Sequence, residues 1–303
     1  MPAVRPSAPS ALPAPSGLSA LSALSGLSWG RRYLMCRPEH FRVDYAINPW
    51  MDLSIPVDPA LALDQWDALR ATIEAAGASV ELVPGVPQHP DMVFAMNLGL
   101  VDGDAVLVTS FRHPQRRAEA DAAAAWFAAN GFAVHRMSGA AAFEAGDAFV
   151  LGDALVVAHG PRTDLSAHRE IAAALGVRVA PVGVVHPALY HLDLSLCPLD
   201  ERRALVAPSA WDVAGAAVIR SLVPEPLVLS EQEAFTFCAN SIVVGDTVIM
   251  PACPHRVRRR LEAWGFHVVL VDVSELHRGG GSIRCMTLPL DTDLGPARLA
   301  RAA

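Results

Sequence analysis

The sequence has no long apolar run, no excess of positive charge and no paired cysteine motif. A membrane-spanning helix would need about 18 consecutive apolar residues, which argues against one here. The net charge of -7, without long blocks of one sign, provides no basic surface for a phosphate backbone, so no nucleic-acid or membrane partner is expected. The five cysteines are odd in number and widely spaced, which fits neither a disulfide framework nor a CxxC metal site. We therefore expect reduced thiols and a cytoplasmic protein, and a homo-oligomer is compatible with the sequence.

The composition divides the chain into a short tail and one large domain. Residues 1–30 are rich in Ala, Pro, Ser and Leu, and Ser, Pro and Gly interrupt every apolar run there, unlike in a targeting segment. Such a composition cannot offset the entropy lost on ordering. The chain as a whole is 52% hydrophobic over 303 residues, enough for a sizeable core. We predict a disordered tail over residues 1–30 and a single domain over 31–303.

A fixed order of elements repeats along this domain. Five segments carry helix signals; four of them stop at a glycine, one stops before a proline, and each precedes a β-type run. The predicted helices span residues 58–77, 114–131, 164–176, 210–222 and 254–265. Several are preceded by two apolar runs joined by a polar turn, typical of a β-hairpin. These runs span residues 98–101 with 105–108, 148–150 with 154–157, and 241–244 with 247–250.

A polar residue opens each unit, and the openers are evenly spaced. They are separated by 50, 46, 47 and 45 positions, and they are Asn97, Asp147, Asp193, Asn240 and Cys285. Self-similarity at such a period indicates an array of equal supersecondary units. We predict an α/β fold of five strand-strand-helix-strand units around a central pocket, with the C-terminal strand joining the N-terminal segment to close the ring. The alternative is an ordinary α/β sandwich with coincidental spacing.

Equivalent units would direct their opening side chains toward one axis, so chemistry is expected there. Cys285 follows the glycine run 279–281, which permits close approach of a ligand, and Arg284 beside it would favour the thiolate. Strand alternation would place His191 and Asp193 on one face as an acid-base pair. The alternatives are an inert buried cysteine and a chance His-x-Asp pattern.

Carboxylates suited to a cationic substrate lie near the other openers. Glu144 and Asp147 precede one β-type run, and Asp91 stands shortly before Asn97. Carboxylates are the natural partners of a guanidinium group, which presents five donors in a planar fork. Arg162, just before a predicted helix, would pair with a substrate carboxylate or with surface charge. Each of these segments is alternatively an ordinary turn.

In their order along the chain, these segments resemble the guanidine-modifying superfamily of the pentein fold. This superfamily includes arginine deiminase, dimethylarginine dimethylaminohydrolase, arginine dihydrolase and the amidinotransferases. The likeness covers about residues 33–290. It rests on residues 35–38, 44–51, 90–94 with Asn97, 144–147, 191–193 and the glycine run that leads to Cys285.

The resemblance implies a role for each matching residue. Cys285 matches the nucleophile, His191 the general acid-base, and Glu144 the carboxylate that holds the guanidinium. Asp91 matches a second substrate-binding acid, and Arg162 the arginine that meets the substrate α-carboxylate. The expected substrate-binding side chains are Asn48, Asp91, Asn97, Asp147, Arg162 and Asp193.

One departure from the family bears on the reaction. Arginine deiminases and the methylarginine enzymes carry an aspartate where this chain has Asn97, and the pair Asn48 and Asn97 is similar to arginine dihydrolases. The resemblance implies a cysteine-dependent hydrolase that cleaves a guanidinium C–N bond of arginine or a methylated arginine. It implies a covalent thiouronium intermediate and neither a metal nor an organic cofactor. The alternatives are an amidinotransferase with an amine acceptor and a non-catalytic arginine-binding protein.

Overall fold

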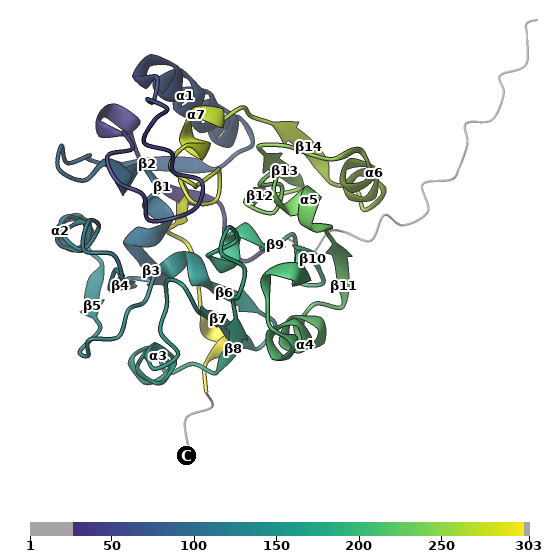
Figure 1. Ribbon diagram of the computed structural model, residues 1–303. Coiled ribbons are helices and arrows are strands. Elements are labelled where there is room, and N and C mark those ends of the chain that lie inside the picture. Colours follow the sequence, from purple (N-terminus) through teal and green to yellow (C-terminus); the bar gives the residue numbers. More distant parts are fainter. Residues whose placement is uncertain (1–26, 300–303) are drawn as a thin grey trace, which may run out of the picture.

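The structure is a computed structural model, and it describes residues 27–299. Five three-stranded sheets stand around a common axis, and α1, α2, α3, α4 and α6 lie on the outside of the ring (Figure 1). In every sheet the middle strand pairs antiparallel with one neighbour and parallel with the other. The five-unit α/β propeller predicted from the sequence is confirmed.

The sheets follow one another along the chain. In spatial order their strands are β15 (Leu288–Pro289), β1 (Arg32–Cys36) and β2 (Ser79–Val83); β3 (Gly99–Asp102), β4 (Ala105–Val108) and β5 (Ala133–Arg136); β6 (Ala148–Leu151), β7 (Ala154–His159) and β8 (Val179–Gly183); β9 (Leu196–Pro198), β10 (Arg203–Val206) and β11 (Glu225–Val228); and β12 (Ile242–Val244), β13 (Thr247–Met250) and β14 (His267–Leu270). The helices are α1 (Pro59–Ala75), α2 (Glu119–Ala129), α3 (Ala167–Leu175), α4 (Val213–Leu222), α5 (Glu231–Ala234), α6 (His255–Ala263) and α7 (Ser274–His277).

The two ends of the domain share one sheet. Leu34 pairs with Leu288 and Tyr33 with Pro289, so the last strand completes the sheet that the first strand begins. Because this pairing uses the edge of β1 that β2 leaves free, the ring closes without an open edge at the join.

Most predicted helices begin later in the structure than the sequence signals place them. Residues 114–118 form turns before α2, in which Arg117 N–H donates to the Pro114 carbonyl at 3.3 Å. α4 begins at Val213 because the Asp212 side chain caps it by accepting from Gly215 N–H. α1 begins at Pro59 as predicted, with Asp58 as its cap.

The structure corrects the end of the predicted tail. Residues 1–26 lie outside the described residues, but Trp29 is buried and belongs to the core. The Arg284 guanidinium stacks on its ring at 4.9 Å, and the backbone N–H groups of Gly30 and Arg31 donate to the Asp291 carboxylate. These contacts offset the ordering cost that the sequence argument assigned to the whole segment. Over residues 27–299, no helix combines the length and the apolar character that a membrane crossing requires.

Gly160, which follows β7, is expected to be a stability-critical position. A Cβ atom there would lie 2.3 Å from the carbonyl oxygen of Val184, and its φ of +151° disfavours other residues. Gly160→Ala should lower the free energy of unfolding in urea by about 3 kcal/mol. Gly152→Ala is the matched control: with φ of +55° and nothing within 4 Å, it should lose only about 1 kcal/mol. Equal losses for the two variants would contradict the backbone clash.

Candidate active site

The polar residues that open the units connect neighbouring units around the axis. Three of them lie in short 3-10 turns directly before their hairpins. The side chain of Asn97 accepts a hydrogen bond from Gly146 N–H at 2.8 Å, and that of Asp147 accepts from Leu192 N–H at 3.0 Å. In both cases the donor is the residue just before the next opener. The openers therefore hold the turns of adjacent units in register.

The same connection continues to the cysteine and back to the first of these units. Asn240 donates from Nδ2 to the Asp193 carbonyl at 2.9 Å and accepts from Cys285 N–H at 3.2 Å. The Cys285 carbonyl accepts from Met96 N–H at 2.9 Å. We call these contacts, with those of Asn97 and Asp147, the axial ring. The ring fixes the backbone of Cys285 on both sides.

The Cys285 thiol lies among polar groups in a buried position. Its Sγ is 3.2 Å from Asn240 Nδ2 and 3.5 Å from Asp193 Oδ2. Burial, together with the negative charge of Asp193, raises the pKa of this thiol well above its usual value, and the Asn240 amide acts in the opposite direction. Burial raises the pKa of Asp193 itself to about 6, against the pull of His191 and Arg284. Cys285 is therefore a neutral thiol in this state of the site.

The sequence analysis did not select Asn240 as a site residue, although its spacing had marked it as an opener. It assigned thiolate stabilisation to Arg284 instead. The Arg284 guanidinium stacks on Trp29 at 4.9 Å and on Phe149 at 5.1 Å, and Sγ receives its hydrogen bond from Asn240. The even spacing of the openers was the signal that could have identified Asn240, because openers at equivalent positions meet at the axis.

The glycine run before Cys285 permits close approach of protein side chains. A Cβ atom on Gly281 would lie 2.4 Å from the ring of Phe94, and one on Gly280 would lie 2.4 Å from Asn48 Oδ1. Asn48 also donates to the Gly279 carbonyl at 3.0 Å. This expected substrate-binding residue therefore fastens the glycine run to the segment that precedes α1.

Glu144 is the centre of a buried charge cluster. Its Oε2 lies 2.9 Å from His191 Nε2 and 3.0 Å from a terminal nitrogen of Arg162, and its Oε1 accepts from Arg112 N–H at 3.3 Å. Burial opposes ionisation, but the Arg162 charge and the hydrogen bond from His191 together hold the pKa of Glu144 far below its ordinary value. Glu144 is thus held as a carboxylate at neutral pH.

The position of His191 corrects the sequence analysis in two respects. It does not lie on a strand but directly before the 3-10 turn Leu192–Leu194. The carboxylate that contacts its ring is Glu144 and not the Asp193 that follows it in the sequence. A long-range contact of this kind has no signal in a short motif.

Arg162 is buried beside Glu144 and contacts three different residues. Besides Glu144 it donates to the Ile47 carbonyl at 3.1 Å, and its guanidinium stacks on the Tyr190 ring at 4.4 Å. The Tyr190 hydroxyl donates to the Gly280 carbonyl at 2.8 Å. Arg162 therefore joins Glu144 to the segment that precedes α1.

Asp91 provides an acceptor that is not satisfied within the described part of the chain. Its Oδ2 accepts from the Tyr45 hydroxyl at 3.0 Å, whereas the buried Oδ1 has no partner among residues 27–299. Burial raises the pKa of Asp91, and the nearby Arg116 partly offsets this effect. Arg116, which the sequence analysis missed, donates to the Asp91 carbonyl and is itself paired with Glu119 at 2.7 Å.

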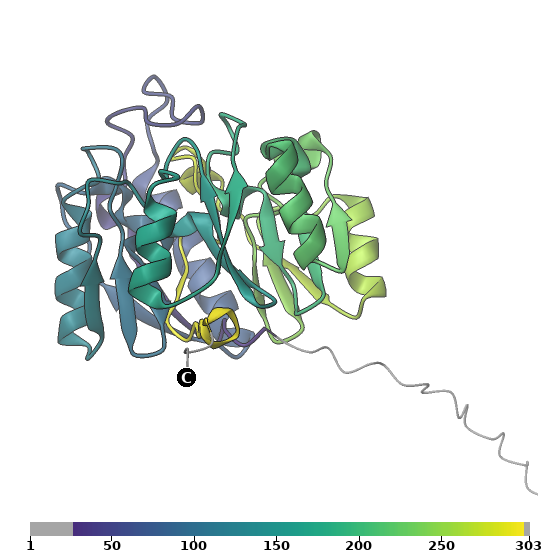
Figure 2. The same ribbon diagram turned by 90° about the horizontal axis from the view of Figure 1, so that it is seen from below.

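These side chains enclose a small chamber with about 10 Å³ of free space, less than an amino acid needs. Its walls include Cys285, His191, Arg162, Asp91, Asn97, Asn48 and Arg116. Asp147 and Asp193 do not line it; Asp147 accepts from the Thr163 hydroxyl at 2.6 Å behind the wall. The purple segment before α1 rises beyond the sheets in Figure 2, and three of its residues, Ile47, Asn48 and Met51, form part of the chamber wall.

Within residues 27–299, no three His, Cys, Asp or Glu side chains are grouped so that they could hold a metal ion. A cysteine on the axis of five like sheets, facing a carboxylate and histidine pair, defines a guanidine-modifying enzyme of the pentein class. The family model described as "N,N dimethylarginine dimethylhydrolase, eukaryotic" matches residues 34–292, and the chain belongs to this family of hydrolases, which act on C–N bonds of linear amidines.

Relatives with different activities resemble the chain to a similar degree. The N(G),N(G)-dimethylarginine dimethylaminohydrolase of Mycobacterium tuberculosis is 38% identical over 264 residues, 86% of each chain. The bifunctional arginine dihydrolase/ornithine cyclodeaminase ArgZ of Synechocystis is 35% identical over 88% of this chain, which spans only 38% of ArgZ.

Solved structures give the same result. The N-terminal domain of ArgZ, a cyanobacterial arginine dihydrolase, was determined as a cysteine-to-serine variant bound to substrate. It superposes with a TM-score of 0.84 at 34% identity, covering 87% of this chain and 99% of that domain. A dimethylarginine dimethylaminohydrolase adduct, at 24% identity and a TM-score of 0.71, shares the fold.

Two substitutions beside Cys285 are expected to shift its pKa in opposite directions. Asp193→Asn removes a negative charge and should lower the thiol pKa, whereas Asn240→Ala removes a donor to sulfur and should raise it. A shift of one unit would change the thiolate fraction about tenfold. The measurement is the rate of iodoacetamide labelling of the Cys285 peptide across pH. The half-buried Cys253 serves as the internal control, and shifts of the same sign in both variants would contradict this account.

Proposed function

We propose that the protein hydrolyses free arginine through to ornithine, carbon dioxide and ammonia, with Cys285 as a covalent nucleophile. The observation that carries this proposal is that the Cys285 thiol and the Asp91 carboxylate line one chamber, while the Glu144 carboxylate contacts His191 and Arg162 in its wall. Asp91 Oδ1 is an unmatched acceptor, and Glu144 is held ionised. Both suit a guanidinium, whose N–H groups are all donors. The match of the chain to an arginine dihydrolase domain supports the same substrate class.

The first chemical step uses the charge of the substrate. A bound guanidinium beside Sγ offsets the burial and the Asp193 charge that keep Cys285 protonated. When substrate is present the thiol therefore gives its proton to His191, which lines the same chamber, and the thiolate forms. The thiolate attacks the guanidinium carbon and forms a C–S bond. His191, hydrogen-bonded to Glu144, gives a proton to the departing nitrogen, which leaves as ammonia. The product of this step is a thiouronium attached to Cys285.

Water completes the first cycle. His191, now neutral, takes a proton from a water molecule that attacks the thiouronium carbon, the C–S bond breaks, and a ureido group remains on the substrate. A variant of ArgZ has been determined covalently bound to a reaction intermediate, which supports a covalent route in this family.

A second cycle on the ureido group explains the presence of Asn97. Its Oδ1 is occupied by Gly146 N–H, so the amide nitrogen is the end available to a ligand in the chamber that Asn97 lines. An N–H donor stabilises a ureido oxygen, whereas a carboxylate there would repel it. A second attack by Cys285 would release another ammonia, and hydrolysis of the thiocarbamate would give a carbamate that decomposes to ornithine and carbon dioxide.

Hydrolysis of a methylated arginine is the second candidate, favoured by the 38% identity to the mycobacterial relative. The test is to incubate the purified protein with arginine and with asymmetric dimethylarginine separately and to follow the products by mass spectrometry. We expect ornithine and ammonia from arginine, without urea. Citrulline and dimethylamine from the methylated substrate, with arginine unchanged, would favour the second candidate, and no product from either would refute both. Cys285→Ser should be inactive, and residual activity in that variant would refute the covalent route.

Asn97→Asp is expected to stop the reaction on arginine after one hydrolysis. The new carboxylate would repel a ureido oxygen while still binding a guanidinium, so citrulline should accumulate and the ornithine yield should fall about tenfold or more. The ratio of citrulline to ornithine at full conversion measures this effect. Asn48→Asp, also beside the chamber, is the matched control and should change the ratio less. An unchanged ratio in Asn97→Asp would contradict the assigned role.

A further inference from the structure

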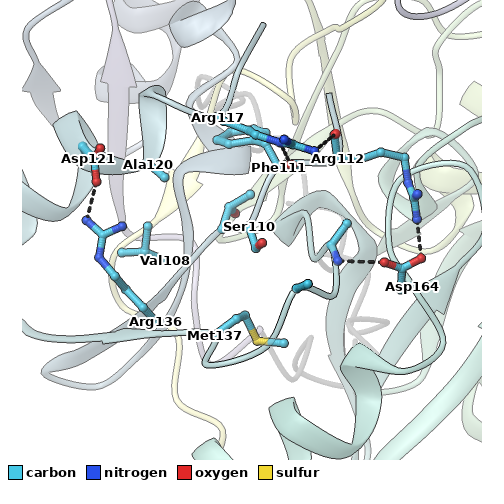
Figure 3. A pocket seen from close by; sticks show the side chains of 13 residues that line it. Val108, Ser110, Phe111, Arg112, Arg117, Ala120, Asp121, Arg136, Met137 and Asp164 are labelled. Carbon is cyan, nitrogen blue, oxygen red and sulfur yellow. Dashed lines mark hydrogen bonds and ion pairs between the residues drawn. The ribbon is translucent and has the colours of Figure 1, made fainter. Parts of the chain in front are cut away.

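A second cavity lies outside the axis, on the flank of the unit formed by β3, β4 and β5. It has a volume of about 540 Å³, within the range of about 300–1,000 Å³ typical of small-molecule sites. The residues after β4, the start of α2 and the loop after β5 form its walls, and Figure 3 shows the hollow between them. By contrast, the axial chamber has about 10 Å³ of free space. We call this cavity the flank groove.

The flank groove has one uncompensated positive charge. Arg112 pairs with Asp164 at 2.5 Å, and Arg136 pairs with Asp121 at 2.9 Å. The Arg117 guanidinium, by contrast, donates only to the backbone carbonyls of Phe111 and Arg112, at 3.3 and 3.1 Å. Among the described residues it has no carboxylate partner. The groove is therefore suited to a ligand with a single negative charge.

Two buried polar atoms in the groove walls also lack partners among residues 27–299. These atoms are the hydroxyl of Thr109, a residue only 3% exposed, and Nε of Arg112. Neither atom is accessible from the groove, so a carboxylate would reach them only after the Arg112 side chain moved. An unmatched buried donor costs about 1–3 kcal/mol, which favours such a movement. Val108 and Met137 flank the same hollow in Figure 3, and of the two the half-buried Met137 provides the accessible apolar surface.

We propose that the flank groove is a second binding site, for a small carboxylate with an apolar body. The carboxylate would contact the donors on the side of Arg112 and Arg117, and the apolar body would pack on Met137. This site is distinct from the axial chamber and does not depend on the substrate assigned to that chamber.

The groove wall has two contacts that reach the catalytic carboxylate. Arg112 N–H donates to Glu144 Oε1 at 3.3 Å, while the Arg112 side chain pairs with Asp164. Asp164 in turn accepts from Ala142 N–H at 2.8 Å, two residues before Glu144. A carboxylate that draws the Arg112 guanidinium away from Asp164 would disturb both segments that hold Glu144. Occupancy of the groove should therefore raise KM for the guanidino substrate.

The binding test uses 4-bromobenzoate, whose bromine can be located by anomalous diffraction. We expect a bromine peak in the flank groove of soaked crystals and saturable binding in solution by calorimetry. Arg117→Gln should weaken the Kd about tenfold, and Thr109→Val, which keeps the side-chain shape, should weaken it about threefold. Arg178→Gln, a surface arginine outside the groove, is the matched control and should leave the Kd unchanged.

Several outcomes would overturn the proposal. They are bromine density only in the axial chamber or nowhere, equal affinity for the neutral 4-bromobenzamide, and an unchanged Kd in both groove variants. The link to Glu144 is tested separately, by KM with saturating 4-bromobenzoate, which should rise about fivefold in the wild type but not in Arg117→Gln. Groove binding without any change in KM would refute that link. Calorimetry on Cys285→Ser tests binding without turnover, so failure of the groove proposal cannot be confused with failure of the proposed reaction.

Discussion

The axial ring of hydrogen bonds is the constraint on which the site depends. Five short segments from five sheets converge on the axis, and polar groups of the openers satisfy the backbone or side chains of the neighbouring units there. Asn97 and Asp147 do this directly, and Asn240 holds both the N–H and the sulfur of Cys285. For the proposed covalent reaction, a sulfur whose backbone is held on both sides is preorganised for attack on the substrate.

The buried charges gain their function from this rigidity. Glu144, Arg162 and His191 form a cluster in which each side chain is nearly inaccessible to water. Removing such charges from water is costly, and the cluster is tolerable because the pairs and the Arg112 N–H satisfy the carboxylate. Asp91 differs because one of its oxygens lacks a partner in the described chain. The chamber therefore contains a buried acceptor, Asp91 Oδ1, without a donor among the described residues, and a cationic ligand with N–H groups would supply one.

The sequence contained enough information to predict the architecture. Glycine stops and hairpin turns repeat with the units, so the five units, their order and a join between the C-terminal strand and the N-terminal segment were predicted from the spacing. The register of that join, in which Leu34 pairs with Leu288, was not predicted. Contacts between units were harder to predict. The His191 ring faces Glu144, 47 positions away, and not its sequence neighbour Asp193. The start of α2 was also misplaced, because the turns at 114–118 satisfy the same proline and polar signals as a helix start.

Equivalent positions in the ring have come to serve different purposes. Each opener needs only to be small and polar to hold its neighbour, so four carry an amide or a carboxylate, and the fifth carries a thiol whose own backbone supplies the connecting groups. Since Cys285 bonds through its N–H and carbonyl, its sulfur is not needed for the fold and is left for chemistry. Asp193, whose carbonyl takes part in the ring, likewise has a carboxylate that can set the pKa of that sulfur. The repeat of the units thus places two side chains together on the axis: the thiol of Cys285 and the carboxylate of Asp193, whose charge raises the pKa of that thiol.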